Sequence, residues 1–245
     1  MPLTNQQRLI WESTYLSNIY EAEDEQGKIY IIKRNTAKAR RDEIFFMHWL
    51  LNNSHPNLLI PFDVQAVNGY LEETYEKINL PLLDNIATQL FPFEGGTRYG
   101  WATQHALGVI AQITSALGHI HSQGFVHGDA RARNIFVNPA GLEIKLFDYN
   151  SVSRPYFLLD GRRDIHYEVP PEYRAGSAEI DFTFDVYQAG KLFVYLTHDF
   201  KNRPRVQLND DLLNFISKST AGDKNERYRD CNEMHEDILR IAKTI

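Results

Sequence analysis

Three polar side chains near the middle of the chain have the types and the spacing of a magnesium site. Asp129 and Asn134 lie within one short segment, and Asp148 follows a little later. Carboxylate and amide oxygens are ligands that Mg²⁺ prefers, and this ion usually completes its shell with water and phosphate oxygens. The three residues therefore predict a site for a magnesium-bound phosphate compound.

The residues between Asn134 and Asp148 predict the hairpin that would bring these two side chains together. Two short apolar or alternating runs, 135–137 and 143–147, flank the turn formers Asn138-Pro-Ala-Gly141. If the runs pair as antiparallel strands, Asn134 and Asp148 become cross-strand neighbours with Cα atoms about 4.5–5.5 Å apart. A hairpin with polar ends and no chemistry is the alternative interpretation.

The same stretch resembles the catalytic and magnesium loops of the protein kinase family. The matching features are His127-Gly-Asp129, Asn134 five residues further on, and Asp148-Tyr-Asn after the hairpin. The resemblance extends from about Glu12 to Ala242. It implies ATP and Mg²⁺ as cofactors.

The resemblance also implies an α+β, bilobal protein-kinase-like fold. Residues 1–78 would form the N-lobe, a small five-stranded antiparallel sheet with one helix. Residues 79–245 would form a mainly helical C-lobe. Helix-like spacing of apolar residues in 101–122 and the strong hairpin signal Asn68-Gly69 agree with this organisation.

Each polar residue of the loops receives a role from the resemblance. Asp129 would accept or orient the proton of the attacking hydroxyl, and Asn134 and Asp148 would hold Mg²⁺ against the nucleotide phosphates. Arg131 lies where serine/threonine kinases carry a lysine near the γ-phosphate. The ending Ala132-Arg-Asn134 is instead common in tyrosine kinases. The type of acceptor hydroxyl therefore stays open.

Two further residues, in the N-terminal third, are candidates for nucleotide binding. Residues 12–33 predict two strands around the turn Asp24-Glu-Gln-Gly27, and Lys33 follows the second strand as the phosphate-binding lysine of kinases follows Val-Ala-Ile. Glu43, in a predicted helix over 37–51, is the candidate ion-pair partner of Lys33. The alternative is a solvated helix glutamate.

The largest departure from the family lies in the loop that should be rich in glycine. Glu12, Thr14 and Ser17 occupy the positions of its three glycines. Glycines let backbone amides approach phosphates closely, so ATP binding is expected to be weak, to use an altered loop, or to be absent. Gly128 replaces the arginine that in many kinases receives an activation-segment phosphate, so phosphorylation of that segment is not the expected switch.

The C-terminal half carries further matches that concern stability. Residues 151–170 correspond to the activation segment, which ends in Pro171-Glu172. Arg227 is the expected partner of Glu172, and Asp185, near the start of the apolar segment 184–196, is expected to anchor the catalytic loop. These matches add to the resemblance without adding chemistry.

Composition limits the class of protein. The chain has 245 residues, 43% of them hydrophobic, and a net charge of −6, which argues against a nonspecific nucleic-acid binder. The single cysteine, Cys231, forms no internal disulfide and no cysteine-based zinc site. Neither a signal peptide nor an 18-residue apolar span is present. A cytoplasmic protein with no membrane partner is therefore expected.

Three functions fit these observations. The first is an ATP- and Mg²⁺-dependent protein kinase acting on a serine or threonine hydroxyl of a protein substrate, with tyrosine as the alternative acceptor. The second is a pseudokinase that serves as a binding or regulatory scaffold for a partner protein, favoured by the missing glycines. The third is a small-molecule phosphotransferase of the aminoglycoside kinase type, whose loop also reads His-Gly-Asp. Pro171-Glu172 argues against the third, because those enzymes lack this motif.

Overall fold

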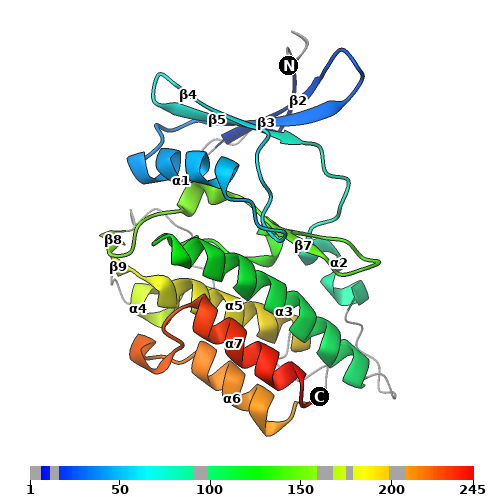
Figure 1. Ribbon diagram of the computed structural model, residues 1–245, viewed down its shortest axis with the longest axis vertical. Coiled ribbons are helices and arrows are strands. Elements are labelled where there is room, and N and C mark those ends of the chain that lie inside the picture. Colours follow the sequence, from blue (N-terminus) through cyan, green and yellow to red (C-terminus); the bar gives the residue numbers. More distant parts are fainter. Residues whose placement is uncertain (1–6, 12–16, 91–98, 159–167, 175–178, 199–207) are drawn as a thin grey trace. The chain divides into compact units, whose positions relative to one another are not determined.

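The computed structural model describes residues 7–11, 17–90, 99–158, 168–174, 179–198 and 208–245. The chain divides into two compact units, and each is described by itself. Unit 1 comprises Met1–Ser54 and Leu59–Asn79, and unit 2 comprises His55–Leu58 and Leu80–Ile245. Most elements of both units are labelled in Figure 1.

Unit 1 is a five-stranded antiparallel sheet with one helix. The strand order is β1-β2-β3-β5-β4. The elements are β1 (Arg8–Trp11), β2 (Ser17–Glu23), β3 (Ile29–Asn35), α1 (Arg41–Asn52), β4 (Asp63–Val67) and β5 (Tyr70–Glu76). Both predicted hairpins form, and their turns use the left-handed region at Gly27 (φ 80°), Asn68 (φ 54°) and Gly69 (φ 83°).

Strand β1 was not predicted, and helix α1 begins later than expected. The four residues of β1 are too few to show an alternating pattern. The helix was predicted from Ala37 but starts at Arg41. The preceding segment is tied instead to the β4–β5 hairpin, where Ala39 N donates to Gly69 O at 2.8 Å.

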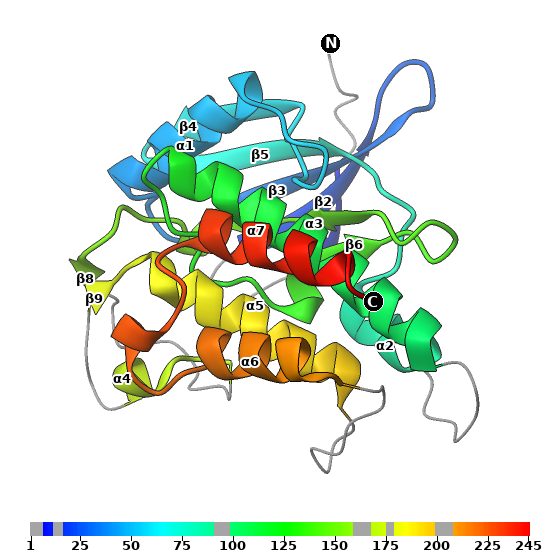
Figure 2. The same cartoon turned by 60° about the horizontal axis from the view of Figure 1, so that its bottom comes forward.

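Unit 2 is mainly helical. Figure 2 shows α3, α5, α6 and α7 lying side by side, with α2 at one end of the group. The helices are α2 (Leu83–Leu90), α3 (Tyr99–Ser122), α4 (Pro171–Arg174), α5 (Phe182–Thr197), α6 (Asp210–Ser219) and α7 (Cys231–Ala242). Short strands form two antiparallel pairs, β6 (Ile135–Val137) with β7 (Ile144–Leu146) and β8 (Phe157–Leu158) with β9 (Glu179–Ile180).

The core of unit 2 forms around α3. The predicted apolar stripe of this helix is confirmed, because its members are all completely buried; they are Ala106, Ile110, Ile113, Leu117 and Ile120. Helices α5 and α7 pack against α3. Cys231, at the start of α7, is buried as a free thiol.

The segment His55–Leu58 belongs to unit 2, although it falls within the range expected for the N-lobe. Backbone and side-chain hydrogen bonds explain this assignment. Leu146 N donates to Asn57 O at 2.8 Å, and Asn57 Nδ2 donates to Gln112 Oε1 at 2.8 Å. The segment therefore holds strand β7 against helix α3.

The two units together give the α+β fold that the sequence predicted, with a sheet and one helix in the first unit and a mainly helical second unit. Across the part of the chain that the structure describes, no helix combines the length and the apolar character needed to cross a membrane.

Candidate active site

Helix α5 fixes the backbone of the loop that carries Asp129. Asp185, completely buried on α5, accepts hydrogen bonds from His127 N at 2.7 Å and from Gly128 N at 2.8 Å. Gln188, one turn further along α5, accepts from Ala130 N at 2.8 Å. Because Gly128 has a φ of +74°, a side chain at this position would strain the backbone. Asp185 thus has the anchoring position that the resemblance predicted, and Gln188 is an anchor that the sequence reading missed.

A buried histidine supports this anchor from the other side. His121 Nε2 lies 3.0 Å from Asp185 Oδ2, and His121 Nδ1 accepts a hydrogen bond from Cys231 N at 3.1 Å. Since Nδ1 is an acceptor, Nε2 carries the proton and donates to Asp185. The first residue of α7 is thereby linked through His121 to the loop that carries Asp129.

Within the loop, the carboxylate of Asp129 is held on both oxygens. Asn134 Nδ2 donates to Asp129 Oδ2 at 2.8 Å and to Asp129 O at 2.9 Å. Arg131 Nη2 lies 2.5 Å from Asp129 Oδ1, and Arg131 Nε lies 4.0 Å from Glu168 Oε2. The structure therefore brings together Asp129, Arg131 and Asn134, and it adds Glu168, which sequence reasoning missed.

These contacts fix which atom of Asn134 is available to a cation. Both acceptors contributed by Asp129 require the amide nitrogen of Asn134 on their side, so the amide oxygen points away from Asp129. Amide and carboxylate oxygens are ligands that suit Mg²⁺. Among the described residues no group of three or more His, Cys, Asp or Glu could hold a metal ion.

The predicted pairing of Asn134 with Asp148 is wrong by one residue. The β6–β7 register pairs Ile135 with Leu146, and Phe147 N donates to Asn134 O at 3.0 Å. Phe147 is therefore opposite Asn134. The predicted strand 143–147 ends one residue early, at Leu146, and Asp148 adopts the left-handed conformation, with φ 67° and ψ 75°.

Tyr149, the residue after Asp148, packs in the core of unit 2. Its side chain is completely buried, its hydroxyl donates to Leu146 O at 2.9 Å, and its ring lies edge-on to His127 at 5.6 Å. Burial lowers the pKa of His127, so this imidazole is neutral at physiological pH. A tyrosine in the position of the family's phenylalanine therefore remains a core residue.

In unit 1, Lys33 on β3 and Glu43 on α1 are both buried. Their side chains contact different residues. Lys33 Nζ lies 3.6 Å from Glu73 Oε1. Glu43 Oε1 accepts from Asn35 Nδ2 at 2.8 Å, and its Oε2 accepts from Arg40 N at 3.3 Å. The expected Lys33–Glu43 ion pair is not among the contacts of the described residues. Glu73 is a residue that sequence reasoning missed.

The positions of the missing glycines are only partly described. Glu12 and Thr14 lie outside the described residues, as does 159–167 of the activation segment. Ser17, at the start of β2, is 4% exposed.

Comparison with known proteins identifies the family to which this chain belongs. A family model described as protein tyrosine and serine/threonine kinase matches residues 24–156, more than half of the chain. The chain belongs to the protein kinase family. The matched range includes Lys33, the segment 127–134 and Asp148, which are residues on which the sequence resemblance depends.

Individual relatives agree with this assignment. The probable serine/threonine-protein kinase PknB of Lactococcus lactis is 23% identical over 91% of this chain and 39% of its own length. The serine/threonine-protein kinase PknG of Mycolicibacterium smegmatis is 25% identical over 57% of this chain and 19% of its own length. Serine/threonine-protein kinase Nek3 of Mus musculus is 28% identical over 59% of this chain and 27% of its own length. The chain thus spans less than half the length of these relatives.

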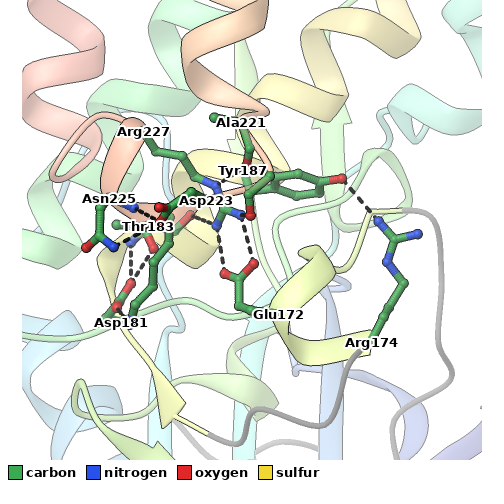
Figure 3. Close-up of polar contacts among 11 residues, drawn as sticks. Glu172, Arg174, Asp181, Thr183, Tyr187, Ala221, Asp223, Asn225 and Arg227 are labelled. Atoms are coloured by element: carbon green, nitrogen blue, oxygen red, sulfur yellow. Dashed lines mark hydrogen bonds and ion pairs between the residues drawn. The ribbon is translucent and has the colours of Figure 1, made fainter.

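The kinase-family ion pair between Glu172 and Arg227 is present in unit 2 (Figure 3). Arg227 donates from Nη1 and Nη2 to the two oxygens of Glu172, both at 2.8 Å. The Arg227 side chain is completely buried, whereas that of Glu172 is 21% exposed. Arg227 Nε also donates to Ala221 O at 2.8 Å, and the guanidinium lies over the Tyr187 ring at 4.8 Å. This prediction is confirmed, and the pair joins α4 to the segment before α7.

Proposed function

We propose that this chain is an ATP- and Mg²⁺-dependent protein kinase that transfers the γ-phosphate to a serine, threonine or tyrosine hydroxyl of a protein substrate. The observation that carries the proposal is the arrangement of Asp129, whose carboxylate is fixed by Arg131 and Asn134 on a loop anchored to α5. Phosphoryl transfer depends mainly on positioning and charge neutralisation, so a rigid carboxylate beside an arginine suits it.

In this proposal each side chain has one task. Asp129 accepts the proton of the attacking hydroxyl, or orients that hydroxyl toward the phosphate. Arg131, 2.5 Å from Asp129, orients the carboxylate and provides positive charge for the transferred group. Asn134 and Asp148 hold Mg²⁺ through their oxygens, and Lys33 binds phosphate oxygens. The Mg²⁺ neutralises phosphate charge when bound.

A pseudokinase is the second candidate function, favoured by the residues that replace glycine. With Glu12, Thr14 and Ser17 in that loop, a close approach of backbone amides to phosphates costs more than it would with glycines. In that case the chain acts as a scaffold for a partner protein.

Thermal stability with ATP distinguishes the two functions without knowledge of the substrate. A hundredfold excess of MgATP over its dissociation constant adds about 2.7 kcal/mol. For a chain of this size, this corresponds to a rise in Tm of about 5–11 °C. We expect that rise in the wild type with Mg²⁺, and we expect Asp148→Asn to abolish it because the carboxylate is lost from the metal site.

Asp211→Asn is the matched control. Asp211 lies on α6 with a side chain 40% exposed and pairs with Arg240, so the same chemical change there should leave the MgATP shift intact. No shift in the wild type at millimolar MgATP would refute ATP-dependent transfer and favour the pseudokinase. A full shift in Asp148→Asn would remove Asp148 from the metal site.

A further inference from the structure

The backbone register of unit 1 places a glutamate directly opposite the candidate phosphate-binding lysine. Strands β3 and β5 are antiparallel neighbours, and Lys33 pairs with Glu73. Side chains of directly opposed residues project from the same face of the sheet. Accordingly, Lys33 Nζ lies 3.6 Å from Glu73 Oε1, and the two side chains are 10% and 1% exposed.

The carboxylate of Glu73 depends on Lys33 for charge compensation. Its Oε2 accepts a hydrogen bond from the Tyr75 hydroxyl at 2.5 Å. Its Oε1 is buried and accepts no hydrogen bond from the described residues, so the ammonium of Lys33 is the nearby group that offsets its charge. A buried carboxylate without such compensation is costly. The Tyr75 hydroxyl thus orients the Glu73 carboxylate, and this carboxylate orients the Lys33 ammonium.

Glu43 is engaged elsewhere. Its carboxylate accepts from Arg40 N, the backbone group at the start of its own helix, and from Asn35 Nδ2 on β3. The first contact is the glutamate half of a capping box. Burial and the charge of Glu73 raise the pKa of Glu43, while Arg40 and Lys33 oppose this. These contacts bind Glu43 to the helix start.

We propose that Glu73, on β5, is the positioning residue that holds Lys33 for the nucleotide, in place of the α1 glutamate. Both partners lie on adjacent strands of one sheet, so backbone hydrogen bonds set their separation. The position of Lys33 is therefore independent of movement of α1. The consequence for nucleotide binding rests on the proposed function, whereas the pairing itself can be tested without ATP.

The ATP-independent test is the rate at which acetic anhydride acylates Lys33, followed by mass spectrometry of the full chain after digestion. The reagent attacks the neutral amine. Loss of a neighbouring carboxylate lowers the pKa of an ammonium, and one unit of pKa changes the neutral fraction tenfold. We expect Glu73→Gln to accelerate acylation of Lys33 about three- to tenfold. We expect Glu43→Gln to leave the rate within about twofold of the wild type.

Glu72→Gln is the matched control. Glu72 is adjacent in sequence, but it faces the opposite side of the sheet and forms an ion pair with Arg34. Its replacement should leave Lys33 acylation unchanged. Lys28 and Lys77, which pair with Glu76 and Glu21, are internal references for the reagent, because their exposed ammonium groups should react at the wild-type rate in every variant.

The second readout is the dissociation constant for MgATP by calorimetry. Glu73→Gln should weaken binding about tenfold, a change of about 1.4 kcal/mol. Glu43→Gln and Glu72→Gln should change it by less than about threefold. If the wild type binds no ATP, the proposed function fails while the acylation test still decides the pairing. The proposal is overturned if a folded Glu73→Gln leaves Lys33 acylation at the wild-type rate, or if Glu43→Gln accelerates it more than about threefold. The second criterion compares Glu43→Gln with the wild type, so it holds even if Glu73→Gln does not fold.

Discussion

Replacement of Asp129 by asparagine is expected to lower phosphoryl transfer about a thousandfold. A positioned general base contributes typically about 10²–10⁴ to the rate, and asparagine keeps the size of the side chain while losing the charge. Its amide oxygen can still accept the hydrogen bond from Asn134 Nδ2, whereas the ion pair with Arg131 is lost. Transfer of radiolabelled phosphate to the protein itself and to arrays of serine, threonine and tyrosine peptides measures the loss.

Nucleotide binding provides the control for this variant. Asp129 is assigned no direct role in binding ATP, so Asp129→Asn should show the wild-type MgATP thermal shift while its transfer rate falls. Transfer above about one tenth of the wild-type rate would be incompatible with a general-base role, given the usual size of that effect. A simultaneous loss of the thermal shift would indicate that the substitution disturbs the site as a whole.

Local features of the site could be predicted from sequence because short segments determine them. The hairpin between Asn134 and Asp148 follows from two apolar runs and a turn, and β6 and β7 form there. The exact register could not be obtained, because β7 ends at Leu146 and Asp148 adopts a left-handed conformation. A pattern of alternating residues gives the pairing of two strands but not the residue at which the second one ends.

Pairings between distant segments were harder to predict. Lys33 and Glu73 come from strands separated by α1 and β4, so only the assembled sheet places them opposite each other. The resemblance favoured Glu43 because the family takes its partner from the helix. Glu172 and Arg227 are also distant, but there the resemblance identified both residues correctly. Family motifs therefore identified the Glu172–Arg227 pair, whereas the contact between Lys33 and Glu73 becomes visible only in the assembled sheet.

Removal of the Arg227 side chain is expected to destabilise the protein by about 3 kcal/mol. Breaking a buried ion pair by truncating one partner typically costs about 3–5 kcal/mol, and partial exposure of the Glu172 side chain places this case at the lower end. Arg227→Ala also leaves the carbonyl of Ala221 without its Nε donor. Urea unfolding followed by far-ultraviolet circular dichroism, which reports the helices of unit 2, measures the change.

Three further variants make the cause of this loss visible. Arg229→Ala is the matched control, because that side chain is 82% exposed and lies 3.8 Å from Asp230; its loss should cost less than about 0.5 kcal/mol. Arg227→Lys should recover only part of the stability, since one ammonium cannot bind both oxygens of Glu172. In Arg227→Ala, adding Glu172→Gln should restore some stability, because it removes the carboxylate left without a partner. If Arg227→Ala unfolded at the same urea concentration as Arg229→Ala, the ion pair would have no part in holding α4 to the segment before α7.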